Sequence, residues 1–404
     1  MFEDLAPEDV LAAVAATDFA ALAPDDLGAS RIDAVAALER VVRVAQARIV
    51  EQIDGLYRDR LQHVPVGHGD PSLSVAAEVA MARGVSPATG RSQFALMMAL
   101  QPMRAVRSAF GAGEISEPVA RAIAREIQNL DDHTAEAVDA ALERDLTQLT
   151  PGKATQLTRE LVVTHDVEAA RQREIAERAI QYVHHYPEPG GIASLVVRGP
   201  AEQLLATHQA LQSHADRRRA AGDPRYRGQL MAGALFERVT GLTQAEGHDV
   251  DLSIVMPLQA LQGAPVAAEL AGHGSITPGL AAQIADTAGQ TWYRRLFTDP
   301  AGDLARLDTR RRCFTGALAR WIRTRDHHRC RQPGCGCRSK EIDHITPHRR
   351  GGPTTQTNGQ AVCRLSNLIK ELPGWRTTRG TNGEVIWTTP TGHTYTSPAP
   401  RRSG

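Results

Sequence analysis

A run of polar residues between positions 341 and 371 carries the side chains best suited to chemistry. Asp343 and His344 are adjacent inside the short apolar segment EIDHI, and Asn358 and Asn367 follow after a long polar loop. A neutral imidazole can take a proton from water, and carboxylate and amide oxygens are ligands that Mg²⁺ and Mn²⁺ prefer. The residue types therefore indicate a general base beside a metal ion.

The elements that must position these groups are a strand and a helix. Asp343 and His344 are neighbours in the predicted strand, so they point to opposite faces unless a local twist or a metal ion brings them together. Asn367 and Lys370 lie three residues apart in the predicted helix and share one of its faces. Alone, the Asp-His pair is a weak signal, and the remainder of the segment strengthens it.

The rest of the chain predicts a mainly α fold with a small α/β element. Helical periodicity begins in residues 8–62 and, after a Gly/Pro-rich break, continues to about residue 180. Short β-branched runs at 190–199 and 249–257 predict strands, with two helical stretches between them. Near the end, Asn382-Gly383 and Pro390-Thr391-Gly392 predict two turns between short strands.

Charge is distributed unevenly, although the 46 basic and 46 acidic residues of the whole chain balance. Residues 306–404 hold 19 Lys and Arg against 6 Asp and Glu, a net charge of +13, which leaves −13 on the remainder. Such a tail can be a solvated charged surface or a surface for a polyanion. Together with the polar cluster inside it, the charge favours nucleic acid as the partner.

The sequence predicts neither a membrane span nor an export signal. No uncharged apolar run reaches the roughly 18 residues that a membrane helix requires. The first residues, MFEDLAPEDV, are acidic and lack the basic and apolar regions of a signal peptide. We therefore expect a cytoplasmic protein.

The order and spacing of the cluster resemble the HNH nuclease motif. The matching positions are C-x4-C from Cys330, DHI-x-P from Asp343, GG-x-T from Gly351, NGQ from Asn358, Cys363, and N-x2-K from Asn367. So many fixed positions make a chance match far less probable than for a lone Asp-His pair. The resemblance implies a β-hairpin and helix around one divalent metal ion, the ββα-metal fold.

The resemblance also implies a role for each residue. His344 would be the general base, Asp343 and Asn367 would hold Mg²⁺ or Mn²⁺, and Asn358 would orient the His344 ring through its amide. Lys370 would contact a phosphate, although a solvated helix lysine is an equally good interpretation.

Upstream segments such as GGIASLVVRGPAEQLLATHQALQSHADRRRAAGDPR and WIRTRDHHRCRQPGC resemble actinobacterial proteins in which a helical domain of unknown function (DUF222) precedes an HNH domain. These segments identify a family without identifying a chemistry. We predict a helical domain at 1–185, a small α/β element at 186–305, and a basic HNH domain with C-terminal β hairpins at 306–404.

All five cysteines lie in the basic tail, which favours a metal site or free thiols over a disulfide framework. Many similar HNH proteins close a structural zinc site with a Cys-x2-Cys pair, but here the second position is Ser366. Cys330, Cys335 and Cys363 are therefore one ligand short of the usual four, unless Cys337 or His328 completes the set. Structural zinc and three packed thiols both remain open, and the poor ligand Ser366 favours the thiols.

Three functions follow from these observations. The first is metal-dependent endonucleolytic cleavage of DNA. The second is a DNA-binding protein that keeps the HNH scaffold without catalysis, and the third is an interaction module formed by the helical region. The presence of Asp343, His344, Asn358 and Asn367 together favours the enzyme, because a scaffold kept only for binding does not need all four.

Overall fold

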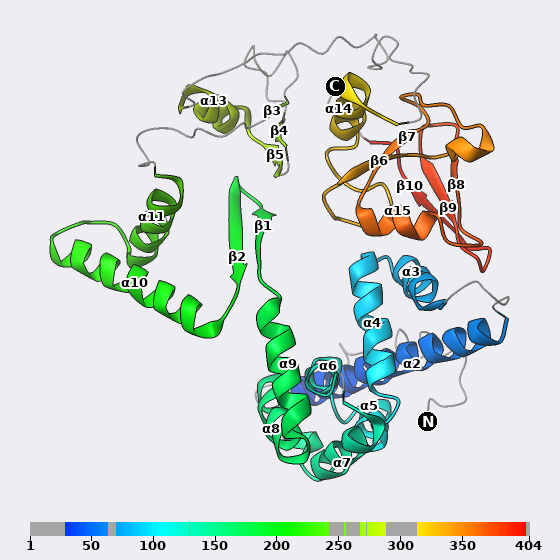
Figure 1. Cartoon of the computed structure of the whole chain (residues 1–404), viewed down its shortest axis with the longest axis vertical. Coiled ribbons are helices and arrows are strands. Elements are labelled where there is room, and N and C mark those ends of the chain that lie inside the picture. The colour runs from blue at the N-terminus through cyan, green and yellow to red at the C-terminus, as the bar shows by residue number, and fades with distance from the viewer. Residues whose placement is uncertain are drawn as a thin grey trace. The chain divides into compact units, whose positions relative to one another are not determined.

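The computed structural model describes residues 29–63, 70–128, 130–241, 254–255, 267–271, 273–287 and 313–400, and Figure 1 shows the chain. By its contacts the chain divides into two units, one of residues 1–76 and 91–173 and one of residues 77–90 and 174–404. Residues 8–28 of the predicted helical region and the predicted boundary at 305 lie outside the described residues. The boundaries at 185 and 305 remain predictions.

The helical part confirms the predicted α structure. It consists of α2 (Ala29–His63), α3 (Ser72–Ala82), α4 (Pro87–Ala99), α5 (Arg104–Gly111), α6 (Glu117–Glu126), α7 (Asp132–Leu142), α8 (Pro151–His165) and α9 (Val167–Ala179). Phe110, Ile123 and Leu142 are fully buried in its core. Thr150 caps α8 by accepting a hydrogen bond from the Lys153 backbone, as the preceding Thr-Pro sequence indicates.

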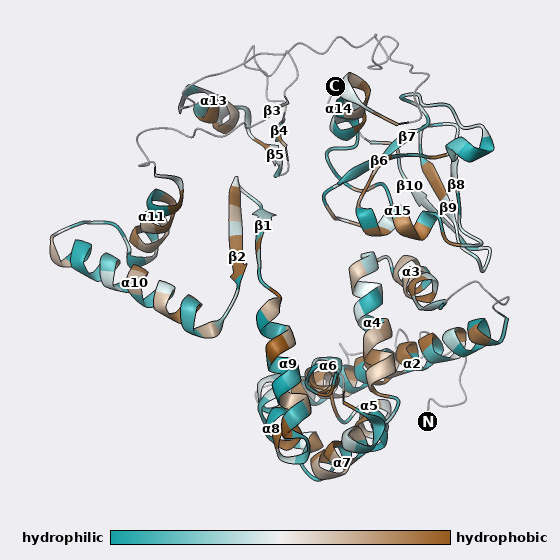
Figure 2. Cartoon of the chain, viewed as in Figure 1, coloured by the Kyte–Doolittle hydropathy of each residue, from teal (hydrophilic) through white to brown (hydrophobic). Residues whose placement is uncertain are grey.

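The middle of the chain forms the predicted small α/β element. A hairpin of β1 (Tyr182–Glu188) and β2 (Ile192–Arg198) precedes α10 (Ala201–Ala220) and α11 (Arg227–Thr240). The three-stranded sheet β3 (Ile254–Val255), β4 (Ala268–Leu270) and β5 (Gly274–Ile276) follows, with α13 (Pro278–Thr287) after it. Figure 2 shows hydrophobic residues along much of β2, and Ile192 and Leu195 are exposed there. The β-branched run at 190–199 predicted β2, whereas no sequence pattern predicted β1.

The C-terminal part, residues 313–400, holds the polar cluster. Helix α14 (Gly316–Arg325) precedes the antiparallel pair β6 (Glu341–His344) and β7 (Gly359–Val362), which α15 (Arg364–Lys370) follows. A three-stranded antiparallel sheet, in the order β10-β9-β8, is built from β8 (Arg376–Arg379), β9 (Val385–Thr388) and β10 (Thr394–Ser397). Both predicted turns join its strands, with Gly383 and Gly392 at positive φ. The predicted ββα core and the terminal hairpins are confirmed.

A buried carboxylate fastens α14 to β7. Asp326, at the end of α14, accepts the backbone N–H of Ala361 at 2.8 Å and forms ion pairs with Arg325 and Arg331. Burial of an unpaired charge costs several kcal/mol, so this network is stable only with all its partners in place. The hairpin is thereby held against a helix outside the motif.

Within the described residues, no helix is long and apolar enough to cross a membrane.

Candidate active site

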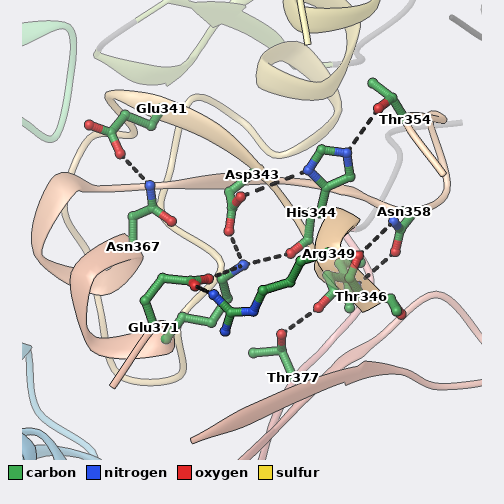
Figure 3. Close-up of polar contacts among 12 residues, drawn as sticks. Glu341, Asp343, His344, Thr346, Arg349, Thr354, Asn358, Asn367, Glu371 and Thr377 are labelled. Carbon is green, nitrogen blue, oxygen red and sulfur yellow. Dashed lines mark hydrogen bonds and ion pairs between the residues drawn. The ribbon is translucent and has the colours of Figure 1, made fainter. Parts of the chain in front are cut away.

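Strand β6 carries both central residues of the site. Asp343 is paired with Gln360 and His344 with Gly359 across to β7. Side chains alternate along a strand, so Glu341 and Asp343 share the face turned toward α15, whereas His344 starts from the other face. Figure 3 shows these side chains together with Asn367.

His344 is buried and held in one orientation. Its ring is 4.5 Å from the Phe314 ring between centroids, and its Nε2 lies 2.9 Å from Oγ1 of Thr354. Its Nδ1 lies 4.0 Å from Oδ1 of Asp343. The two side chains therefore approach each other despite strand alternation, at a separation too long for a direct hydrogen bond.

Lys370 binds the other oxygen of Asp343. Its ammonium forms an ion pair with Oδ2 of Asp343 and donates a hydrogen bond of 2.9 Å to the carbonyl of His344. The side chain is buried and also lies 3.3 Å from Glu371. Burial would raise the pKa of the Glu371 carboxyl, but Lys370 and Arg349 together lower it. In this structure Lys370 is paired with Asp343 and Glu371, and its contact with a phosphate stays a prediction.

Asn367 faces the same space from α15. Its Nδ2 donates a hydrogen bond of 2.6 Å to Oε2 of Glu341. Figure 3 shows the amide oxygen of Asn367 on the side that faces Asp343. Glu341 therefore holds the Asn367 amide with its oxygen directed toward Asp343. Asp343 is the other metal ligand that the sequence predicts.

Asn358 has a different partner from the one predicted. Its Oδ1 accepts the backbone N–H of Thr346 at 2.8 Å, and its Nδ2 donates to the carbonyls of Thr346 and Pro353 at 3.0 and 2.8 Å. The expectation that its amide orients the His344 ring is wrong, and Thr354 occupies that position. Asn358 instead closes the loop between β6 and β7, which places Thr354 beside the ring.

Because the buried Asn358 side chain makes three hydrogen bonds to backbone groups of Thr346 and Pro353, we expect Asn358→Ala to lower the free energy of unfolding by roughly 2–4 kcal/mol. Urea denaturation followed by circular dichroism measures this change. Gln356→Ala is the matched control, since it removes an amide of the same loop whose oxygen has no hydrogen-bond partner within the described residues. Equal stability of the two variants would show that the loop does not depend on Asn358.

Three cysteines form a second site. The Sγ atoms of Cys330, Cys335 and Cys363 lie within 4.8 Å of one another and are buried. Oγ of Ser366 lies 3.1 Å from the sulfurs of both Cys330 and Cys363 and 3.9 Å from that of Cys335.

The two alternative ligands stay outside this group. Cys337 is exposed, and neither it nor His328 belongs to the set of clustered metal-ligating side chains found in the described residues. Ser366 Oγ is therefore the polar atom next to the three sulfurs, at the position where a fourth ligand would be needed.

Hydrogen bonds within the cluster shift the pKa values of Cys335 and Cys363 in opposite directions. The pKa of Cys335 is raised, because its hydrogen bonds with Cys330 and Cys363 and its burial stabilise the protonated form. The pKa of Cys363 is lowered, because its sulfur accepts hydrogen bonds from Cys330 and Cys335. A thiolate is the form that binds metal.

Three residues of the site had no role assigned from sequence. Thr354 was matched to the motif, but its contact with His344 depends on the path of the loop. Glu341 stands two positions before Asp343, and this spacing alone places it on the same strand face. Phe314 packs against His344 from a segment 30 positions earlier, and no local pattern indicates this contact.

Asp343 and Asn367 fit a divalent cation by their donor atoms. Both offer hard oxygens, and Oδ2 of Asp343 is buried with the Lys370 ammonium as its ion-pair partner. Two protein ligands suit Mg²⁺, which usually keeps several waters and takes further oxygens from a substrate phosphate. The Lys370 ammonium lies against the same oxygen, so a bound cation would share the Asp343 carboxylate with it.

Comparison with known protein families gives two matches along the chain. Residues 29–326 match the family described as "Domain of unknown function (DUF222)", and residues 328–371 match the family described as "HNH endonuclease". No solved structure shows a significant match.

Relatives come from Mycobacterium tuberculosis. The chain is similar to the uncharacterized protein Rv3776 of strain H37Rv, with 30% identity over 375 residues that cover 80% of this chain and 70% of the relative. It is also similar to the uncharacterized protein Rv2100 of the same strain, with 28% identity over 385 residues that cover 80% of this chain and 68% of the relative. The chain thus belongs to the DUF222 family and carries a C-terminal HNH endonuclease domain.

Proposed function

We propose that this protein is a metal-dependent endonuclease that hydrolyses phosphodiester bonds of DNA. The observation that carries the proposal is the assembly at β6 and α15, where a buried, oriented imidazole lies 4.0 Å from a carboxylate that Asn367 faces. Phosphodiester hydrolysis needs a base for water and a cation for the charge on phosphate. The site offers residues for both.

His344 is the proposed general base. If its Nε2 carries the proton and donates it to Oγ1 of Thr354, the lone pair of Nδ1 is directed toward Asp343. Nδ1 then takes a proton from the attacking water, whose oxygen forms the new bond to phosphorus as the bond between phosphorus and the leaving sugar oxygen breaks. The gap between Nδ1 and Oδ1 suits a bridging water.

Asp343 and Asn367 are the proposed metal ligands. When bound, a Mg²⁺ or Mn²⁺ ion supplies charge stabilisation for the phosphate and the leaving oxygen. Glu341 holds the Asn367 amide through Nδ2, and Lys370 holds one oxygen of Asp343. Such supporting contacts typically contribute 10- to 100-fold to metal affinity or activity. Glu341 and Lys370 are therefore positioning residues.

DNA is the proposed substrate because the domain around this site is basic. The net charge of +13 on residues 306–404 provides the attraction for phosphates. A DNA-binding protein without catalysis would use the same charge. It would not need the orientation of His344 or the arrangement of Asn367 and Glu341, so the enzyme is the better account.

Cleavage of supercoiled plasmid by the purified full chain tests the proposal. We expect nicked circles with Mg²⁺ or Mn²⁺ and intact plasmid with EDTA. Binding of the plasmid without cleavage under all of these conditions would support the non-catalytic alternative instead.

We also propose that Cys330, Cys335 and Cys363 hold a structural zinc ion. Three sulfurs converge in a buried site, and hydrogen bonds from Cys330 and Cys335 lower the pKa of the Cys363 thiol. Ser366, or a water in its place, would complete a tetrahedral set. The ion would link the loop before β6 to the start of α15, and so tie the strand of His344 to the helix of Asn367.

Thr354 can be tested as the residue that sets the proton on His344. We expect Thr354→Val to reduce the nicking rate roughly tenfold or more, because the proton would no longer be held at Nε2. DNA affinity without metal should stay within about twofold, since Thr354 is buried. Thr354→Ser keeps the hydroxyl and should restore most of the rate. A valine variant that is as active as the serine variant would contradict this role.

A further inference from the structure

A shallow notch lies beside the site, where the loop after β6 meets the start of β8. Its walls include Arg349 and Arg350 from the loop and Arg376 from β8, and Lys370 and Trp375 contribute to its lining. The match to the HNH family ends at residue 371, so Arg376 belongs to the sheet beyond it. Two segments separated in sequence thus bring arginines to one place.

The contact between these walls is fixed. Oγ1 of Thr377 donates a hydrogen bond of 2.5 Å to the carbonyl of Ile345, the residue directly after His344. Trp375 is buried and packs edge-on against Trp387 of the same sheet. With Thr377 turned inward on β8, its neighbour Arg376 points outward and is exposed. The sheet therefore holds Arg376 at a set position relative to β6.

The arginines of the notch differ in their partners. Arg349 forms an ion pair with Glu371. Arg350 and Arg376 are exposed, and within the described part of the chain neither guanidinium has a hydrogen bond or an ion pair. Two unpaired guanidinium groups that line one notch suit an anion with several acceptor oxygens, and a phosphate has this chemistry.

We propose that Arg350 and Arg376 together bind one backbone phosphate of DNA next to the phosphate that is cleaved. The inference rests on the proposed function for the identity of the polyanion. The proposal makes the sheet β8–β10 part of the DNA-binding surface. Lys370, which also lines the notch, does not bind this phosphate, because its ammonium is paired with Asp343. A contact of this kind fixes the register of the duplex without reading its sequence.

Fluorescence anisotropy of a labelled DNA duplex in EDTA tests the proposal with the full chain at several salt concentrations. Arg350→Gln and Arg376→Gln should each weaken binding about fivefold or more. The double variant should reduce the slope of log affinity against log salt by about 0.9, which corresponds to one phosphate. Arg379→Gln is the matched control, because Arg379 is an exposed arginine of the same strand outside the notch.

Each outcome decides something. A loss for Arg379→Gln as large as that for Arg376→Gln would overturn the proposal, because it would show a general effect of charge. A slope change near 1.8 in the double variant would overturn the shared phosphate, since it indicates two separate contacts. A wild type that does not bind DNA would overturn it as well.

Failure of the inference is distinguishable from failure of the nuclease assignment. If the wild type nicks plasmid and both notch variants bind DNA as tightly as the wild type, the phosphate contact is refuted and the nuclease assignment stands. If the wild type does not nick plasmid but binds DNA through Arg350 and Arg376, the nuclease assignment is refuted and the phosphate contact stands.

Discussion

His344→Ala is expected to lower the rate of metal-dependent plasmid nicking by ~10²–10⁴-fold, the usual contribution of a general base. The imidazole is the proposed base for the attacking water, and its Nδ1 lies 4.0 Å from Oδ1 of Asp343. Its burial keeps it from contributing to the outer binding surface. DNA affinity measured without metal should therefore stay within about twofold of the wild type.

Single-turnover nicking rates in Mg²⁺, together with anisotropy in EDTA, measure the two effects separately. His393→Ala is the matched control, because His393 is an exposed histidine of the same C-terminal part that hydrogen-bonds Thr391 and lies outside the site. Since the buried ring packs against Phe314, thermal melting checks that the variant is folded, and His344→Gln provides a larger replacement if alanine unfolds it. A folded His344 variant with the wild-type rate would refute the assignment of the base.

One zinc ion per chain is the second expected result, and its removal should destabilise the C-terminal part severely. Structural zinc contributes ~10–16 kcal/mol of apparent binding free energy in small zinc-finger peptides. A loss of even a few kcal/mol lowers the melting temperature of a module of this size by more than ~10 °C. We therefore expect both chelation and Cys363→Ala to lower the melting temperature of the C-terminal part, residues 313–400, by at least ~10 °C.

Native mass spectrometry of protein purified without metal-affinity resin measures the zinc content. Cys337→Ala is the matched control, because Cys337 is exposed and outside the cluster, and it should keep the ion. Ser366→Cys should hold the ion more tightly, since a fourth thiolate replaces a poor ligand. Protein without stoichiometric zinc, whose melting temperature is unaffected by a chelator and by Ser366→Cys, would show that the thiols only pack.

The sequence by itself determined the local parts of this protein. The strand with Asp343, the loop and the helix with Asn367 all lie within 31 residues, so residue types predicted a strand and a helix there, and the resemblance to the HNH motif implied the ββα core. Turn residues such as Gly383 and Gly392 adopt positive φ, which side chains other than glycine disfavour, and they marked the terminal hairpins in advance. Helical periodicity likewise indicated the upstream helices, because a period of 3.6 residues reflects one buried face.

Only the tertiary structure decided which polar groups meet. The partner of the His344 ring depends on the path of the loop after β6, and that path is set by hydrogen bonds between the Asn358 side chain and backbone groups. Helical spacing placed Lys370 on the same helix face as Asn367. Its burial against Asp343 depends on the packing of α15 against β6, which the spacing does not give. Sequence spacing gives the face of an element, whereas the partner across the gap depends on packing between elements.

The cysteines show the same limit. Their clustering in sequence indicated a metal site, but Cys337 is only two positions from Cys335 and still lies outside the buried group. The notch of Arg350 and Arg376 required the sheet after the motif to fold back onto the segment after His344, through Thr377 and Ile345. Such contacts join residues about 30 positions apart, and the free energy that selects them comes from burial of the whole domain, which no short pattern contains.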